Sequence, residues 1–199
     1  MAKMQDISSV VSHVIPQNVD NVCNVSSVFP SMVGRTIQGR AGWRIADDGS
    51  PVEVPAFTLT LLPGPYLASA TGTADRFSLS IAFSKAIRLK AIEFDAPPGD
   101  RRRPKTVQVS LEDRVEGTSV ILLQNDVGPW ISSPDRGEGA TTATLAIQEC
   151  DIPEGGAMTL CVNVLCSWGS SEGRSRSVVG EEEASCILSG IRFLGNLTT

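Results

Sequence analysis

The sequence predicts an all-β fold, an antiparallel β-sandwich made of two sheets. Apolar and polar residues alternate with a period of two along most of the chain, which is typical of half-buried strands. No segment carries a helical stripe long enough for the crossover that parallel strands require. The 18 Gly and 12 Pro residues are spread over 199 positions, which indicates frequent turns. These observations exclude a parallel α/β sheet and favour a sandwich or jelly roll.

The first clear strands lie in FTLTLL (57–62) and FSLSIAF (77–83). In both segments apolar residues alternate with Thr, Ser or Ala, so each strand has one face that avoids water. The next segment, IRLKAIEF (87–94), begins with Ile87 on the apolar face and changes phase at Ala91. That change predicts a β-bulge or a strand that crosses between the two sheets.

The strands continue at regular spacing toward the C-terminus. KTVQVSLE (105–112) alternates as a half-buried strand of an antiparallel sheet does. Residues 119–123 are apolar on both faces, which predicts a central strand. Further strands are expected in TTATLAIQE (141–149), MTLCVNVLC (158–166) and CILSGIRFLG (186–195).

Domain organisation follows from where this alternation begins. Residues 54–199 form one sandwich-sized set of strands and are expected to be the β-sandwich domain. Residues 1–53 are less regular and are expected to be an N-terminal extension that packs on the sandwich. Within it, SSVVSHVI (8–15) predicts either a short helix or an edge strand.

Charge and hydropathy narrow the class of partner. The net charge of −5 gives no overall attraction to nucleic acid or to an anionic membrane surface. No run approaches the ~20 apolar residues that span a bilayer. The N-terminal segment lacks the apolar core of a secretory signal. The sequence therefore predicts neither a nucleic-acid nor a membrane partner, and a location in the cytoplasm with the nucleus as the alternative.

The five cysteines are expected to be reduced thiols, since their number is odd and most of them lie in predicted strands. A zinc site is not expected. Cys161 and Cys166 are five positions apart, which would place them on opposite faces of a regular strand. The only histidine, His13, supplies too few further ligands for a tetrahedral site.

The sequence predicts no enzyme. His13 has no nucleophile motif beside it, and neither a P-loop nor a G-x-G-x-x-G or G-x-S-x-G motif occurs. Acidic residues are plentiful, but their spacing selects no pair for acid–base catalysis.

Three loops contain the candidate binding residues. The loop 95–105 carries four cationic side chains, the loop 128–139 carries a tryptophan, and a second tryptophan begins the long loop 167–184. Clustered guanidinium groups bind planar anions, and an exposed tryptophan anchors a protein or stacks on a sugar. The alternatives are solvated arginines and a tryptophan that covers the end of the core. The partner-binding candidates are Arg101, Arg102, Arg103, Lys105, Trp130 and Trp168.

Residues 77–111 resemble the centre of the PITH domain, a module of thioredoxin-like proteins that associate with the proteasome. The resemblance rests on an I-x-F strand, an I-x-L-x-x-I-x-F strand, a proline loop and a P-K-T-V-x-V strand. These motifs comprise Ile81, Phe83, Ile87, Leu89, Ile92, Phe94, Pro97, Pro104, Lys105, Thr106, Val107 and Val109. The segment 190–195 is similar to the closing strand of that family. The resemblance implies a galactose-binding-like jelly roll.

The sequence leaves two candidate functions. The first is a non-catalytic protein–protein interaction module whose partner, by the PITH resemblance, is the proteasome or another multi-subunit assembly. The alternative is a sandwich that binds a carbohydrate or small ligand. No cofactor is expected, with one alternative that the galactose-binding-like resemblance implies: a structural Ca²⁺ held by Asp47 and Asp48 in the loop ADDGSPVE.

Overall fold

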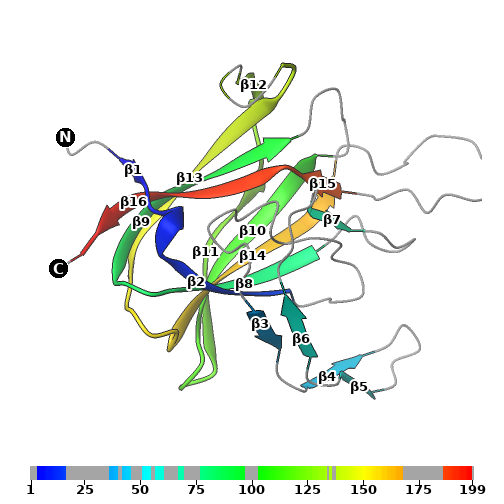
Figure 1. The fold of residues 1–199 in the computed structure, drawn as a ribbon, viewed down its shortest axis with the longest axis vertical. Coiled ribbons are helices and arrows are strands. Elements are labelled where there is room, and N and C mark those ends of the chain that lie inside the picture. Colours follow the sequence, from blue (N-terminus) through cyan, green and yellow to red (C-terminus); the bar gives the residue numbers. More distant parts are fainter. Residues whose placement is uncertain are drawn as a thin grey trace, which may run out of the picture.

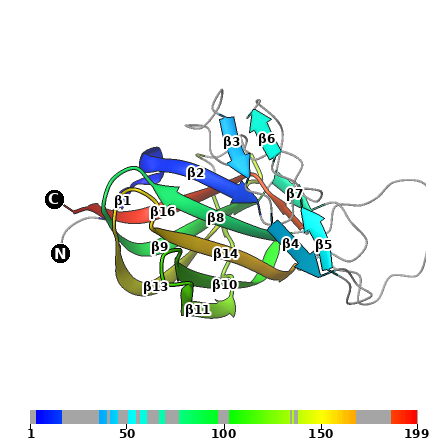
Figure 2. The same cartoon turned by 90° about the horizontal axis from the view of Figure 1, so that it is seen from below.

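Two antiparallel sheets of five strands each lie face to face in the computed structural model (Figures 1 and 2). The structure describes residues 4–16, 36–39, 42–45, 51–54, 57–60, 67–69, 77–96, 103–133, 135, 138–167 and 186–198. Among these residues, helical structure is limited to the 3-10 turn Ser8–Val10 and to the 3-10 conformation of Asp135. The predicted all-β, antiparallel two-sheet sandwich is therefore confirmed.

The first sheet, called sheet A here, has the strand order β1–β16–β9–β13–β12. Its strands are β1 (Gln5–Asp6), β16 (Gly190–Leu197), β9 (Ile87–Ala96), β13 (Thr141–Ile152) and β12 (Ile131–Ser132). Neighbouring strands are antiparallel throughout. The predicted strand 186–195 is divided, because β15 (Cys186–Leu188) pairs elsewhere and β16 begins after Ser189.

The second sheet, sheet B, has the order β11–β10–β14–β8–β2. Its strands are β11 (Thr118–Asp126), β10 (Pro104–Asp113), β14 (Met158–Ser167), β8 (Phe77–Phe83) and β2 (Val11–Pro16). The 3-10 turn Ser8–Val10 leads directly into β2, so the segment 8–15 contains both the helical turn and the edge strand that were expected as alternatives.

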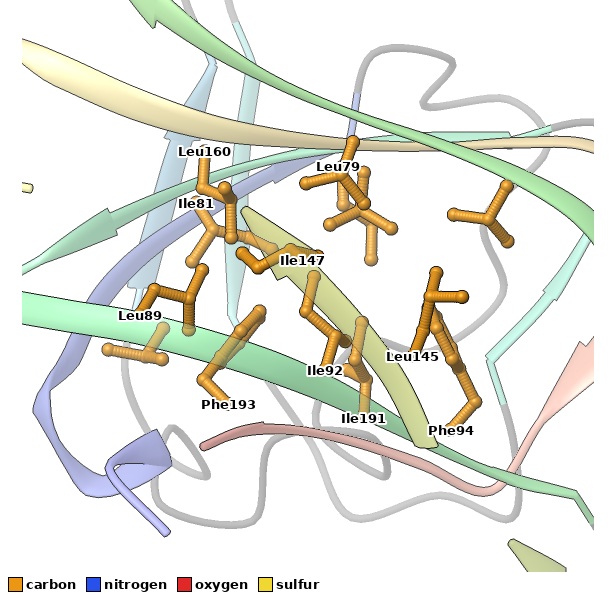
Figure 3. Packing of buried hydrophobic residues seen from close by; sticks show 14 of the residues in the cluster. Leu79, Ile81, Leu89, Ile92, Phe94, Leu145, Ile147, Leu160, Ile191 and Phe193 are labelled. Atoms are coloured by element: carbon orange, nitrogen blue, oxygen red, sulfur yellow. The ribbon is translucent and has the colours of Figure 1, made fainter. Parts of the chain in front are cut away.

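The apolar faces of the two sheets form one core between them (Figure 3). Figure 3 shows Leu79, Ile81 and Leu160 of sheet B pointing toward residues of sheet A such as Ile92. Phe83 and Phe193 meet across the sheets with ring centroids 5.4 Å apart and an interplanar angle of 87°. Edge-to-face contacts of this kind add to the stabilisation from apolar burial.

The predicted phase change in β9 is a β-bulge. Ala91 pairs with Leu194 and Leu89 pairs with Gly195, so Lys90 has no residue opposite it on β16. The two backbones lie very close together beside the bulge. A Cβ placed on Gly195 would overlap the Arg88 carbonyl. Glycine is required where backbones approach this closely.

The prediction of a central strand at 119–123 is wrong, because β11 is an edge strand of sheet B. A register shift opposite Val109 and Ser110 leaves Leu122 as an extra residue on β11. The shift lets Leu122 and Leu123 both pack against the core. Val120 and Ile121 remain 60% and 59% exposed, since an edge strand has no neighbouring strand on one side.

A bulge in β14 corrects the expected placement of two cysteines. Thr106 pairs with Cys166 and Val107 pairs with Val164, so Leu165 is the extra residue of β14. The shift places Cys166 on the same outer face as Cys161 instead of the opposite face. The two thiols nevertheless have different partners, Thr106 and Ser80, and do not form a cluster with each other.

Short strand pairs accompany the sandwich. They are β3 (Thr36–Gly39) with β6 (Phe57–Thr60), β4 (Gly42–Ile45) with β5 (Pro51–Val54), and β7 (Leu67–Ser69) with β15. Figure 2 shows the first two pairs outside the large sheets. Residues 5–6 and 11–16 supply an edge strand to each large sheet, while the proposed division at residue 54 stays a prediction.

The described part of the chain contains no helix that is long and apolar enough to cross a bilayer.

Candidate functional site

Two predicted binding residues from different loops meet at one rim of the sandwich. The guanidinium carbon of Arg103 lies 5.1 Å from the centroid of the Trp130 ring. This distance is within the range of a cation–π interaction, which is strengthened when the pair is partly desolvated. Both side chains are half-buried. We call Arg103, Trp130 and the adjoining Thr141 the rim site.

Arg103 and Trp130 lie at the starts of strands in different sheets. Arg103 directly precedes β10 of sheet B, while Trp130 directly precedes β12 of sheet A. Arg103 Nη1 donates to Thr141 Oγ1 at 3.4 Å, so the contact joins the beginning of β10 to the beginning of β13 across the two sheets. The backbone N–H of Val127 donates to the Lys105 carbonyl at 2.6 Å and ties the loop before Trp130 to β10.

The Trp130 ring also packs against the core. Trp130 therefore covers the core, which was one of the two roles expected for it. The other role was that of an exposed binding residue. The ring also supports the Arg103 side chain. A ring that is held on one side by the core is a rigid platform for the guanidinium.

Two hydrogen-bond donors of the rim site lack a partner. Arg103 Nε and Trp130 Nε1 are both buried, and neither donates to an acceptor within the described part of the chain. An unpaired buried N–H costs about 1 to 3 kcal/mol. Buried donors of this kind are normally paired with a protein group or an ordered water.

A second polar cluster lies next to the rim site on the outer face of sheet A. Arg192 of β16 bonds Asp95 of β9 with Nη1–Oδ2 at 2.6 Å and Nη2–Oδ1 at 3.0 Å. It also donates from Nε to Glu93 Oε2 at 2.9 Å. Thr142 and Thr144 of β13 donate to Asp95 and Glu93 respectively.

The second cluster stabilises the sheet and is not arranged for acid–base catalysis. One guanidinium donates to both carboxylates, so their oxygens are already engaged in hydrogen bonds. Desolvation opposes the charge of Arg192, but the two carboxylates outweigh it, so the pKa of Arg192 is raised above its ordinary value. The sequence did not predict this cluster. Alternation shows that Glu93 and Asp95 share one face of β9, but it does not show that β16, which carries Arg192, pairs with β9.

The other predicted site residues are not brought into the rim site by the described structure. Lys105 is half-buried in β10. Arg101, Arg102, Trp168, Asp47 and Asp48 lie outside the described residues, so their proposed roles stay predictions. Where side chains are described, no group of three or more His, Cys, Asp or Glu could hold a metal ion.

Cys150, Cys161 and Cys166 are free thiols. Burial raises the pKa of Cys161 to about 11, and burial followed by the nearby Asp151 charge raises the pKa of Cys150 to about 11. Thiols with a raised pKa are poor nucleophiles, because the thiolate is the reactive form.

Comparisons with solved structures support the fold. The chain is similar to a structure of the CBM32-1 and CBM32-2 domains of Clostridium perfringens ZmpB in complex with GalNAc, with a TM-score of 0.50 and 8% identity. The match covers 96% of this chain and 35% of that chain. At this identity the likeness concerns the fold alone, and it supports the two-sheet β-sandwich.

Two further structures match over most of their length. One is CBM32-3 from a family 31 glycoside hydrolase of Clostridium perfringens, with TM-score 0.49, 9% identity, and coverage of 97% of this chain and 95% of that chain. The other is a putative chitobiase fragment from Bacteroides thetaiotaomicron, with TM-score 0.48, 11% identity, and coverage of 100% and 96%. No family model and no curated protein matches the chain.

Proposed function

We propose that this chain is a non-catalytic carbohydrate-binding β-sandwich whose ligand contacts the rim site. The observation that carries the proposal is the Arg103–Trp130 pair, in which an aromatic ring and a guanidinium from separate segments meet at one rim. Sugar sites combine an aromatic side chain with a few oriented hydrogen-bond donors. Trp130 is the aromatic residue of the rim site, and the Arg103 guanidinium has N–H donors besides the one that Thr141 Oγ1 accepts.

The fold is compatible with this function. One structure of similar fold is described as a complex with GalNAc. This support is an analogy between folds, so the argument depends on the residues of the rim site.

Titration of the protein with galactose and GalNAc, followed by NMR and calorimetry, tests the proposal. We expect saturable binding that is lost in Trp130→Ala. A matched control is Val115→Ala, because Val115 is 81% exposed and follows the far end of β10. Ten residues of strand place it about 30 Å from Arg103. No binding of either sugar, or equal binding by Trp130→Ala, would contradict the proposal.

The second candidate function is a protein-interaction module, as the PITH resemblance implies. The edge strand β11 favours it, because Val120 and Ile121 are exposed and residues 117–125 contain no charged side chain. An uncharged exposed edge can pair with an extended segment of another protein. The proteasome as partner, and a cytoplasmic or nuclear location, stay predictions.

Affinity capture distinguishes the two candidates. Proteasome subunits that are recovered with the wild-type chain and lost with Ile121→Lys would favour the interaction module. Recovery of no proteasome subunit by the wild-type chain, together with sugar binding that is lost in Trp130→Ala, would favour the carbohydrate-binding function.

A further inference from the structure

We infer that the rim site selects a sugar that carries a carboxylate, and that Arg103 binds this carboxylate. The inference rests on the proposed function and deepens it, since it names the chemical class of the ligand. It follows from the charges around Arg103, which differ from those around the buried Arg192.

Arg103 and Arg192 are both withdrawn from solvent, but of these two only Arg192 contacts a carboxylate of the described residues. Arg192 contacts the carboxylates of Glu93 and Asp95 within 3.0 Å. Arg103 contacts a neutral hydroxyl and an aromatic ring, and no carboxylate of the described residues lies within ion-pair distance of it. A partly desolvated cation without a counter-charge is costly, and an anionic ligand would relieve that cost.

Two contacts position Arg103 in the absence of a ligand. The Trp130 ring lies against the guanidinium at 5.1 Å, and Thr141 Oγ1 accepts from Nη1 at 3.4 Å. The ring itself packs on the core, so the aromatic side of the site is held in place. The long Thr141 bond is weak, which leaves the guanidinium able to turn toward a carboxylate.

The donors that remain on Arg103 match a carboxylate. Its recorded hydrogen bond uses Nη1, which leaves the edge formed by Nε and Nη2. Arg88 uses the same edge in this protein, with Nε and Nη2 donating to the two Asp151 carboxylate oxygens at 2.7 and 2.9 Å. A planar carboxylate therefore fits this edge with two parallel bonds. Nε is covered without ligand, so the second bond requires a rotation of the Arg103 side chain.

Galacturonate and galactose are matched probes, because they differ in the carboxylate at one carbon. We expect the wild-type chain to bind galacturonate at least about ten-fold more tightly than galactose, the discrimination that a charge-assisted pair provides. Arg103→Gln should lower galacturonate binding to the level of galactose. Arg103→Lys keeps the charge without the planar fork and should bind galacturonate with intermediate affinity.

Arg114→Gln is the control, since it removes the same charge from an exposed turn at the far end of β10. It should leave both affinities unchanged, and thermal unfolding checks that each variant is folded. Added NaCl should weaken galacturonate binding while leaving galactose binding nearly constant.

The outcomes separate the inference from the proposed function. Equal affinity of the wild-type chain for the two sugars, lost in Trp130→Ala, would overturn the inference and leave the proposed function standing. Galacturonate binding that persists in Arg103→Gln would also overturn it. Binding of neither sugar would overturn both.

Discussion

The Arg192 guanidinium and the Asp95 carboxylate form a two-bond ion pair between β16 and β9, with N–O distances of 2.6 and 3.0 Å. The two residues are 97 positions apart in sequence and lie on the outer face of sheet A. Both are nearly buried, at 9% and 7% exposure. The pair therefore joins the C-terminal strand to the centre of its sheet.

Asp95→Ala should destabilise the protein by about 3 kcal/mol. Removing one partner leaves Arg192 withdrawn from solvent with a single remaining carboxylate, that of Glu93. Urea unfolding measures the change. Asp151→Ala is the comparison, because it breaks the exposed pair with Arg88 and should change the free energy of unfolding very little. Similar losses for the two variants would contradict this expectation.

Gly190→Ala should destabilise the protein by about 1 to 3 kcal/mol through the same ion pair. A Cβ at this position would lie 2.8 Å from Asp95 Oδ2, so the carboxylate would have to move away from Arg192. A double-mutant cycle with Asp95→Ala measures the coupling. We expect Gly190→Ala to cost clearly less when Asp95 is already alanine, and simple additivity would argue against the contact.

Alkaline pH should destabilise the protein through its buried thiols. The pKa of Cys161 is raised from 9.0 to about 11, so the folded state favours the neutral thiol. This stabilisation is complete below pH 9.0 and is lost as the pH rises toward 11. Urea unfolding across this range should show a smaller loss for Cys161→Ala than for the wild type. Superimposable profiles would mean that Cys161 titrates normally.

Because β11 is an edge strand, an isoleucine-to-alanine substitution should destabilise the protein much less in β11 than in β9. Ile121→Ala should change the free energy of unfolding by less than about 0.5 kcal/mol, because Ile121 is 59% exposed on the edge strand. Ile92→Ala should cost about 2 to 5 kcal/mol, since Ile92 is fully buried in β9. Thermal or urea unfolding of the two variants measures this difference, and a comparable cost would show that β11 is covered.

Local patterns predicted the strands and one irregularity within them. The alternation in 77–83, 87–94 and 141–149 corresponds to β8, β9 and β13, and the phase change at Ala91 corresponds to the bulge at Lys90. These features depend on which side chains face a core, and that information is present in the order of neighbouring residues.

Features that depend on a neighbouring strand were predicted less well. The apolar residues of 119–123 indicated a central strand, yet a bulge allows an edge strand to direct consecutive leucines, Leu122 and Leu123, at the core. The extra residue Leu165 likewise places Cys166 on the same face as Cys161, where opposite faces were expected. A bulge changes the face of every residue beyond it, and nothing in the local pattern of β14 marks its position.

The sequence by itself determined that this protein is an antiparallel β-sandwich with candidate binding residues in its loops. The tertiary structure alone decided that Arg103 meets Trp130 and that Arg192 meets Asp95. Alternation specifies the face of a side chain on its own strand, because it reflects burial. Strand order and loop placement depend on contacts between distant segments, and these contacts give Arg103 an aromatic platform and no counter-charge among the described residues.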